Sequence, residues 1–185
     1  HLPDVIAKTL SDMEKRLEDT VSSSNLEQVM EKQSILDVVE SRILKMLEDR
    51  GIENSGEKAK EYAESIYRAH RSYGVSPFVL AGIMERESGG AADAVSPTGQ
   101  GYGLMQVNWK VHKAWVPDYF PHIRTLEDAM RPENNIMLGA AIYAGALKKY
   151  RGNEEKALQA YLGGNSVKYV QFILNRAKGM ERDKK

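Results

Sequence analysis

The chain contains no cysteine, which excludes disulfides, thiolate nucleophiles and cysteine-based zinc sites. Its four histidines lack the spacing of zinc ligands such as His-Glu-x-x-His, so no metal and no cofactor are expected. No apolar run approaches the roughly 18 residues of a transmembrane helix. The formal net charge is zero, which argues against a nucleic-acid partner held through phosphate contacts. The composition, with 42% hydrophobic and 28% charged residues, is that of an ordinary globular protein.

Glycine and proline are both missing from residues 4–50, and apolar residues recur there at helical steps of three and four. The polar stretch 22–25 interrupts this pattern, and Asn25 followed by Gln28 resembles a capping box. We therefore predict an N-terminal helical hairpin over residues 1–53, an accessory unit that packs on the main domain or self-associates. If the hairpin is separable, residues 54–185 should fold and act alone.

The rest of the chain predicts a mainly α domain with one irregular region. Ser76 before Pro77 has the pattern of an N-cap followed by the first helical residue, and Gly74 that of a C-cap. The glycine-rich stretch 89–108 is expected to form a loop with a small β-hairpin. Helices are predicted at residues 54–73, from Pro77, at 132–150, at 154–161 and at 166–178.

The helix that starts at Pro77 carries a glutamate on its apolar face. At about 100° per residue, Ile83, Met84 and Glu87 share one narrow sector, whereas Glu85 lies on the opposite side. Burial disfavours the charged form of a carboxyl, and a helix C-terminus disfavours an anion. Both effects favour a protonated Glu87 that could serve as a general acid, although a buried structural glutamate has the same pattern.

From Glu87 onward the chain resembles the catalytic domain of the soluble lytic transglycosylases, which shares a lysozyme-like fold with goose-type lysozymes. The similarity lies in four blocks in the expected order and covers roughly residues 60–178. The blocks are "ES" at 87–88, "AVSPTGQGYGLMQVN" at 94–108, "ENNIMLGAAIYAGALKKYRGNEEKALQAYLGGN" at 133–165 and "YVQFIL" at 169–174. The resemblance implies that residues 54–185 form a lysozyme-like catalytic domain.

The resemblance also implies roles for individual residues. Glu87 corresponds to the catalytic acid and base, and Tyr161 to a tyrosine beside that acid. The family has an asparagine after this tyrosine, whereas the present chain has Leu162, and Asn165 is a candidate replacement. The expected substrate-binding residues are Ser88, Ser96, Gly103, Leu104, Met105, Gln106, Asn108, Tyr161, Asn165 and Tyr169.

The activity implied by the resemblance is cleavage of the MurNAc-β-1,4-GlcNAc bond of peptidoglycan, with a 1,6-anhydro-muramoyl product. Most glycosidases use two carboxylates, but no second acid suggests itself here, because Glu85 points away and Asp93 has the pattern of a solvated loop residue. One alternative is a hydrolytic goose-type lysozyme, which would need such an acid. Another is an inactive wall-binding or assembly module, an alternative that Leu162 keeps open.

The expected partners are peptidoglycan glycan strands, together with a larger cell-wall, secretion or phage assembly reached through the N-terminal helices. The expected location is extracytoplasmic, in the cell wall, the periplasm or a phage particle. The chain starts at His1 without a targeting segment, which is expected of a fragment or a mature form.

Overall fold

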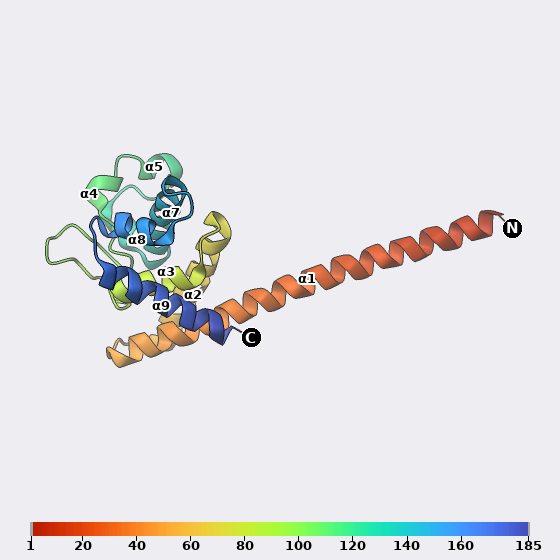
Figure 1. The fold of residues 1–185 in the computed structure, drawn as a ribbon, viewed down its shortest axis with the longest axis horizontal. Helices are drawn as coiled ribbons and strands as arrows, with labels where there is room; N and C mark the ends of the chain where they lie inside the picture. Colours follow the sequence, from red (N-terminus) through yellow and green to blue (C-terminus); the bar gives the residue numbers. More distant parts are fainter. Residues whose placement is uncertain (1, 185) are drawn as a thin grey trace. The chain divides into compact units, whose positions relative to one another are not determined.

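A computed structural model describes the backbone of residues 2–184 and the side chains of residues 11–184, and over this part it is mainly helical (Figure 1). Contacts divide the chain into two units, His1–Ser34 and Ile35–Lys185. None of the described helices is long and apolar enough to cross a membrane. The helices are α1 (Leu2–Asp49), α2 (Ser55–Tyr73), α3 (Pro77–Glu87), α4 (Trp109–His112), α5 (Val116–Tyr119), α6 (Leu126–Met130), α7 (Pro132–Lys149), α8 (Glu154–Leu162) and α9 (Val167–Asp183).

The predicted N-terminal hairpin is wrong, because α1 is one uninterrupted helix through residues 22–25. Polar side chains in and just before this stretch bond back to carbonyls four residues earlier and so remain compatible with the helix. The Thr20 hydroxyl donates to the Arg16 carbonyl at 2.7 Å, and the Ser23 hydroxyl donates to the Asp19 carbonyl at 2.8 Å. Asn25 is therefore an interior helical residue and not a cap.

The two units divide within α1 and not at the predicted boundary between residues 53 and 54. The last four turns of α1 contribute buried side chains to the core of residues 35–185: Ile35, Leu36, Val39, Ile43, Met46 and Leu47. In residues 11–34, by contrast, the large apolar side chains are exposed: Met13, Leu17, Val21, Leu26, Val29 and Met30. The end of α1 is thus part of the main folded unit.

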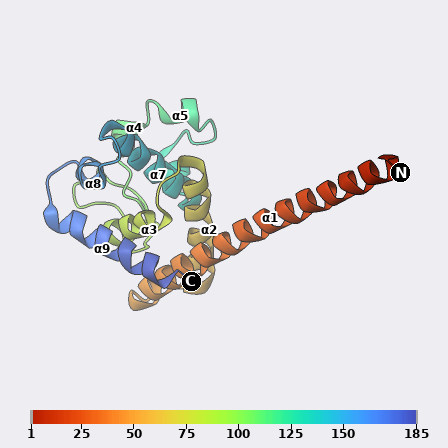
Figure 2. The ribbon, with the colours of Figure 1, turned by 45° about the vertical axis from the view of Figure 1, so that its right-hand side comes forward.

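Helix α3 lies at the centre of the core, and residues 77–84 are all buried. A helix that is apolar on all sides must be covered on all sides. Helix α9 packs along α3, as Figure 2 shows, while α2 packs on α7. Gly82 makes the close approach of α9 feasible, because a Cβ at this position would lie 3.1 Å from the Ile173 carbonyl oxygen.

The mainly α class is confirmed, and the signals at the end of α2 and the start of α3 match the structure. Ser76 caps α3 by accepting from the Val79 amide, and Gly74 ends α2 in the left-handed conformation. The expected hairpin at 89–108 is reduced to isolated antiparallel bridges that join Tyr102 to Val95 and to Val107. The last helix is longer than predicted and continues to Asp183.

Candidate active site

Glu87 is the last residue of α3 and lies half-buried at the end of its apolar stripe. Burial raises the pKa of its carboxyl, while a hydrogen bond from Tyr169 and the nearby Arg86 guanidinium act in the opposite direction. The pKa of Glu87 is raised overall, because loss of solvent disfavours its charged form more than the two contacts favour it. Glu87 therefore holds its proton to a higher pH than an ordinary glutamate, yet it keeps some access to solvent.

Tyr169 reaches Glu87 from the first turn of α9. Its hydroxyl donates to Glu87 Oε1 at 2.5 Å, and its side chain is only 3% exposed. Burial, followed by the charge of Glu87, raises the pKa of Tyr169 far above its ordinary value, so the phenol stays protonated and remains a donor. The resemblance suggested Tyr169 as a substrate-binding residue, and the structure brings its hydroxyl into direct contact with the Glu87 carboxyl.

Tyr161 connects the acid to the loop that follows it. The Tyr161 hydroxyl donates to the Met105 carbonyl at 2.8 Å, and this bond fixes α8 against the turn at 103–106. The pKa of Tyr161 is raised by burial and, in second place, by the charge of Glu87, which puts the two side chains near each other. Glu87, Tyr161 and Tyr169 thus form one cluster from three helices.

Asn135, at the start of α7, holds the turn at 103–106 and was not identified from the sequence. Its Oδ1 accepts from the Met105 amide at 2.7 Å, and its Nδ2 donates to the carbonyls of Tyr102 and Ala129 at 3.0 and 2.9 Å. Gly103 has φ 76°, and a Cβ there would lie 2.6 Å from Asn135 Nδ2. An asparagine in an otherwise apolar helical stripe was the signal available in the sequence.

Most of the polar residues predicted to bind sugar are engaged within the protein. The Ser88 hydroxyl donates to the Met84 carbonyl and accepts from the Gly90 amide. The Ser96 hydroxyl accepts from the amides of residues 100 and 101, and the Asn108 side chain caps α4. Gln106 Nε2 donates to the carbonyls of residues 94 and 103, both at 3.0 Å. These side chains shape the loop that borders Glu87.

The remaining predicted residues divide between core and surface. Leu104 and Met105 are completely buried, so at these two positions the turn can offer only its backbone to a ligand. Asn165 is exposed in the turn between α8 and α9, where it lines a shallow pocket with Tyr150 and Lys156. Leu162 is 40% exposed and is therefore not needed to fill the core.

Neither carboxylate considered as a second acid is arranged for that role. Glu85 points to the opposite face of α3, where it pairs with Arg42 and Arg176. Asp93 is exposed in the loop after α3. Among the described residues, no group of three or more histidine and acidic side chains is arranged to hold a metal ion. Within the part of the chain that the structure describes, the arrangement offers one half-buried acid with two tyrosines and no second carboxylate beside it.

Comparisons with known proteins agree with the helical fold. The family model of the transglycosylase SLT domain matches residues 64–182, which is more than half of the chain. A solved structure with the same fold is that of an inactive mutant of lytic transglycosylase Slt from Pseudomonas aeruginosa, with a TM-score of 0.60 and 18% sequence identity. The match covers 76% of the present chain but only 29% of the Pseudomonas chain. The chain belongs to the transglycosylase SLT domain family.

Proposed function

We propose that this protein is a lytic transglycosylase that cleaves the MurNAc-β-1,4-GlcNAc bond of peptidoglycan and leaves a 1,6-anhydro-muramoyl end. The observation that carries the proposal is Glu87, a carboxyl with a raised pKa that a buried tyrosine holds in place. Membership of the transglycosylase SLT domain family supports the substrate class. From this substrate class we infer that the protein acts outside the cytoplasm.

In the first step, protonated Glu87 donates its proton to the glycosidic oxygen while the bond from C1 of the muramoyl residue to that oxygen breaks. The N-acetyl carbonyl oxygen of the same residue stabilises the positive charge at C1. This assistance replaces the second carboxylate of ordinary glycosidases. The raised pKa of Glu87 serves this step, because a general acid works best when its pKa is near the working pH.

In the second step, the Glu87 carboxylate removes the proton from the C6 hydroxyl of the muramoyl residue. The C6 oxygen then forms a bond to C1, which closes the anhydro ring and restores the protonated acid. No water is consumed, and one group serves as acid and then as base. Tyr169 donates to Oε1 in the resting protein, which leaves Oε2 for the proton that is transferred.

For the substrate contacts, we propose that Tyr161 and the backbone of the turn at 103–106 border the bound sugar. Tyr161 is only half-buried, and its hydroxyl is already committed to the Met105 carbonyl, so its ring is the part available to a sugar. Ser88, Ser96, Gln106 and Asn108 act on the substrate indirectly, through the loop that they hold.

The test is mass spectrometry of the soluble products after incubation with purified peptidoglycan. We expect muropeptides that are one water lighter than reducing-end products, and none from a heat-inactivated sample. Reducing-end products would replace the proposal with a hydrolytic lysozyme and a second acid. Intact peptidoglycan with no product would favour a wall-binding module instead.

Tyr169→Phe is expected to slow cleavage about tenfold, which corresponds to the roughly 1.5 kcal/mol of a hydrogen bond to a charged group. The hydrogen bond from Tyr169 lowers the pKa of Glu87, so its loss should raise that pKa further. The alkaline limb of kcat/KM, which reports the acid of the free enzyme, should therefore move to higher pH. A limb that moves to lower pH or stays in place would show that Tyr169 does not act on Glu87.

A further inference from the structure

The last three residues of α3 each contact a different residue of α9. Glu85 pairs with Arg176 Nε at 3.2 Å, the Arg86 guanidinium lies 5.6 Å from the centre of the Phe172 ring, and Glu87 accepts from Tyr169. The α9 partners lie at steps of three and four residues and therefore share one face of that helix. The hydrogen bond on Glu87 is one of a series of contacts that fix α9 along α3.

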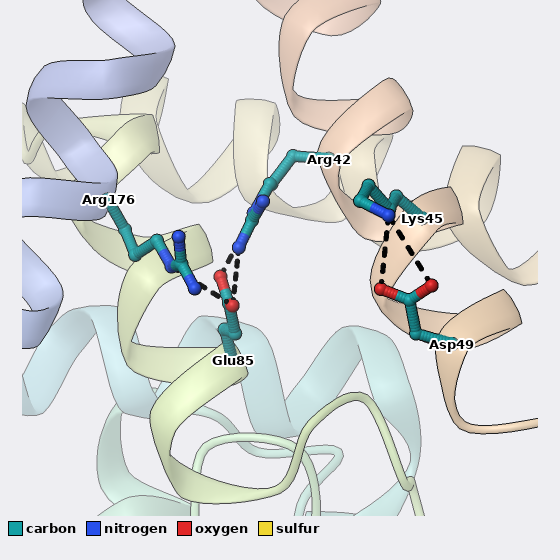
Figure 3. Close-up of polar contacts among 5 residues, drawn as sticks. All are labelled: Arg42, Lys45, Asp49, Glu85 and Arg176. Carbon is teal, nitrogen blue, oxygen red and sulfur yellow. Dashed lines mark hydrogen bonds and ion pairs between the residues drawn. The ribbon is translucent and has the colours of Figure 1, made fainter.

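Glu85 also receives a second cation, from α1 (Figure 3). Arg42 Nε donates to Glu85 Oε2 at 3.1 Å, and Arg42 Nη2 donates to Oε1 at 2.5 Å, so the pair is bidentate. The Glu85 side chain is only 14% exposed and the Arg42 side chain 26%. One carboxylate therefore joins α1, α3 and α9 two residues before the proposed acid.

The end of α1 also contacts the chain directly after Glu87. Arg50 Nη1 donates to the Ser88 carbonyl at 3.4 Å. A Cβ at Gly90 would lie 2.4 Å from Leu47 Cδ2, so this glycine allows the loop to pass against α1. Residues 42–50 thus contact the main chain or side chains on both sides of Glu87.

We propose that Arg42, Glu85 and Arg176 form a positioning cluster that holds α3 and α9 in the register that places the Tyr169 hydroxyl on Glu87. The inference rests on the proposed role of Glu87 as the acid. Apolar packing between α3 and α9 is non-directional. The bidentate contact from Arg42 fixes the orientation of the Glu85 carboxylate, and the ion pair with Arg176 then joins that carboxylate to α9. A partly buried ion pair adds little net stability, so a positional role accounts for it better than a stabilising one.

The test compares Glu85→Gln with Asp49→Asn, which makes the same change from carboxylate to amide in the exposed Lys45–Asp49 pair on α1 (Figure 3). We expect Glu85→Gln to lower kcat on purified peptidoglycan about tenfold, below the roughly 10²-fold cost of a 1 Å misplacement. KM should change less than about twofold, and Asp49→Asn should match the wild type. Circular dichroism and thermal unfolding establish that both variants are folded. Equal activity of the two variants would overturn the proposal.

A double-mutant cycle separates positioning from a general loss of stability. If the cluster acts through Tyr169, then Tyr169→Phe should cost less in the Glu85→Gln protein than in the wild type. Fully additive losses would mean that the two act independently, which the proposal excludes. If the wild type releases no product, the proposed function is wrong, but this result says nothing of the positioning cluster. An NMR measurement that needs no activity then tests the cluster separately.

That measurement is an NMR titration of the Glu87 carboxyl, which needs no activity. The charged and titratable groups that act on Glu87 include Arg86, Tyr161 and Tyr169. Tyr169 lies on α9 and Arg86 contacts Phe172 of α9, so both depend on the register of that helix, and both lower the pKa of Glu87. Loss of the Tyr169 hydrogen bond raises the pKa of Glu87, whereas loss of the Glu85 charge alone would lower it. A midpoint that rises in Glu85→Gln supports the proposal, and one that falls or stays in place overturns it.

Discussion

Glu87→Gln is expected to reduce the rate of peptidoglycan cleavage by about 10²- to 10⁴-fold, the usual contribution of a general acid. Glutamine keeps the shape of the side chain and can still accept the hydrogen bond from Tyr169, but it has no proton to transfer. The measurement is the rate of release of soluble muropeptides, with Asp49→Asn as a matched carboxylate-to-amide control. Undiminished cleavage by Glu87→Gln would place the acid elsewhere in the chain.

The same variant should be more stable than the wild type at neutral pH, which separates loss of chemistry from loss of fold. Burial raises the folded-state pKa of Glu87 above its unfolded value, so folding costs free energy once the group must ionise. Protonated Glu87 makes its full contribution to the free energy of unfolding at pH values below the pKa that it has in the unfolded chain. This contribution is lost as the pH rises through the higher pKa that Glu87 has in the folded protein. Thermal unfolding should therefore show a gain for Glu87→Gln near neutral pH that disappears in acid.

Removal of residues 1–53 is expected to abolish folding, whereas removal of residues 1–34 should leave a folded, active protein. The reason is the six apolar side chains that the end of α1 contributes to the core. At about 1.5–3 kcal/mol each, an upper bound, their burial is worth roughly 9–18 kcal/mol. That matches or exceeds the 5–15 kcal/mol that typically stabilises a whole domain. The shorter chain also loses Arg42 and with it the bidentate contact to Glu85.

The two truncated chains are to be compared by circular dichroism, thermal unfolding and release of muropeptides. We expect residues 35–185 to unfold cooperatively and to cleave peptidoglycan like the wild type. We expect neither property of residues 54–185. If residues 54–185 alone unfolded cooperatively and cleaved peptidoglycan, the end of α1 would be an accessory element, and the positioning role of Arg42 would fall with it.

The sequence by itself determined the local features. The end of α2 at Gly74 and the start of α3 at Ser76 and Pro77 were predictable. Caps act within a few residues, through backbone geometry and short-range hydrogen bonds. Glu87 was identifiable for a similar reason, since the 3.6-residue period alone places it on the apolar face of α3 and Glu85 on the opposite face. The family blocks added the expected role of this residue as the catalytic acid.

Only the tertiary structure decided which distant residues meet. The predicted hairpin was wrong because serines within a helix can bond to their own helix, a choice that their sequence pattern leaves open. The contacts of Asn135 with Met105 and of Tyr169 with Glu87, between residues 30 and 82 positions apart, appeared only in the folded structure. The cluster of Arg42, Glu85 and Arg176 likewise joins three helices that no local pattern relates. Side-chain contacts of this kind depend on how helices pack, which periodicity within one helix does not specify.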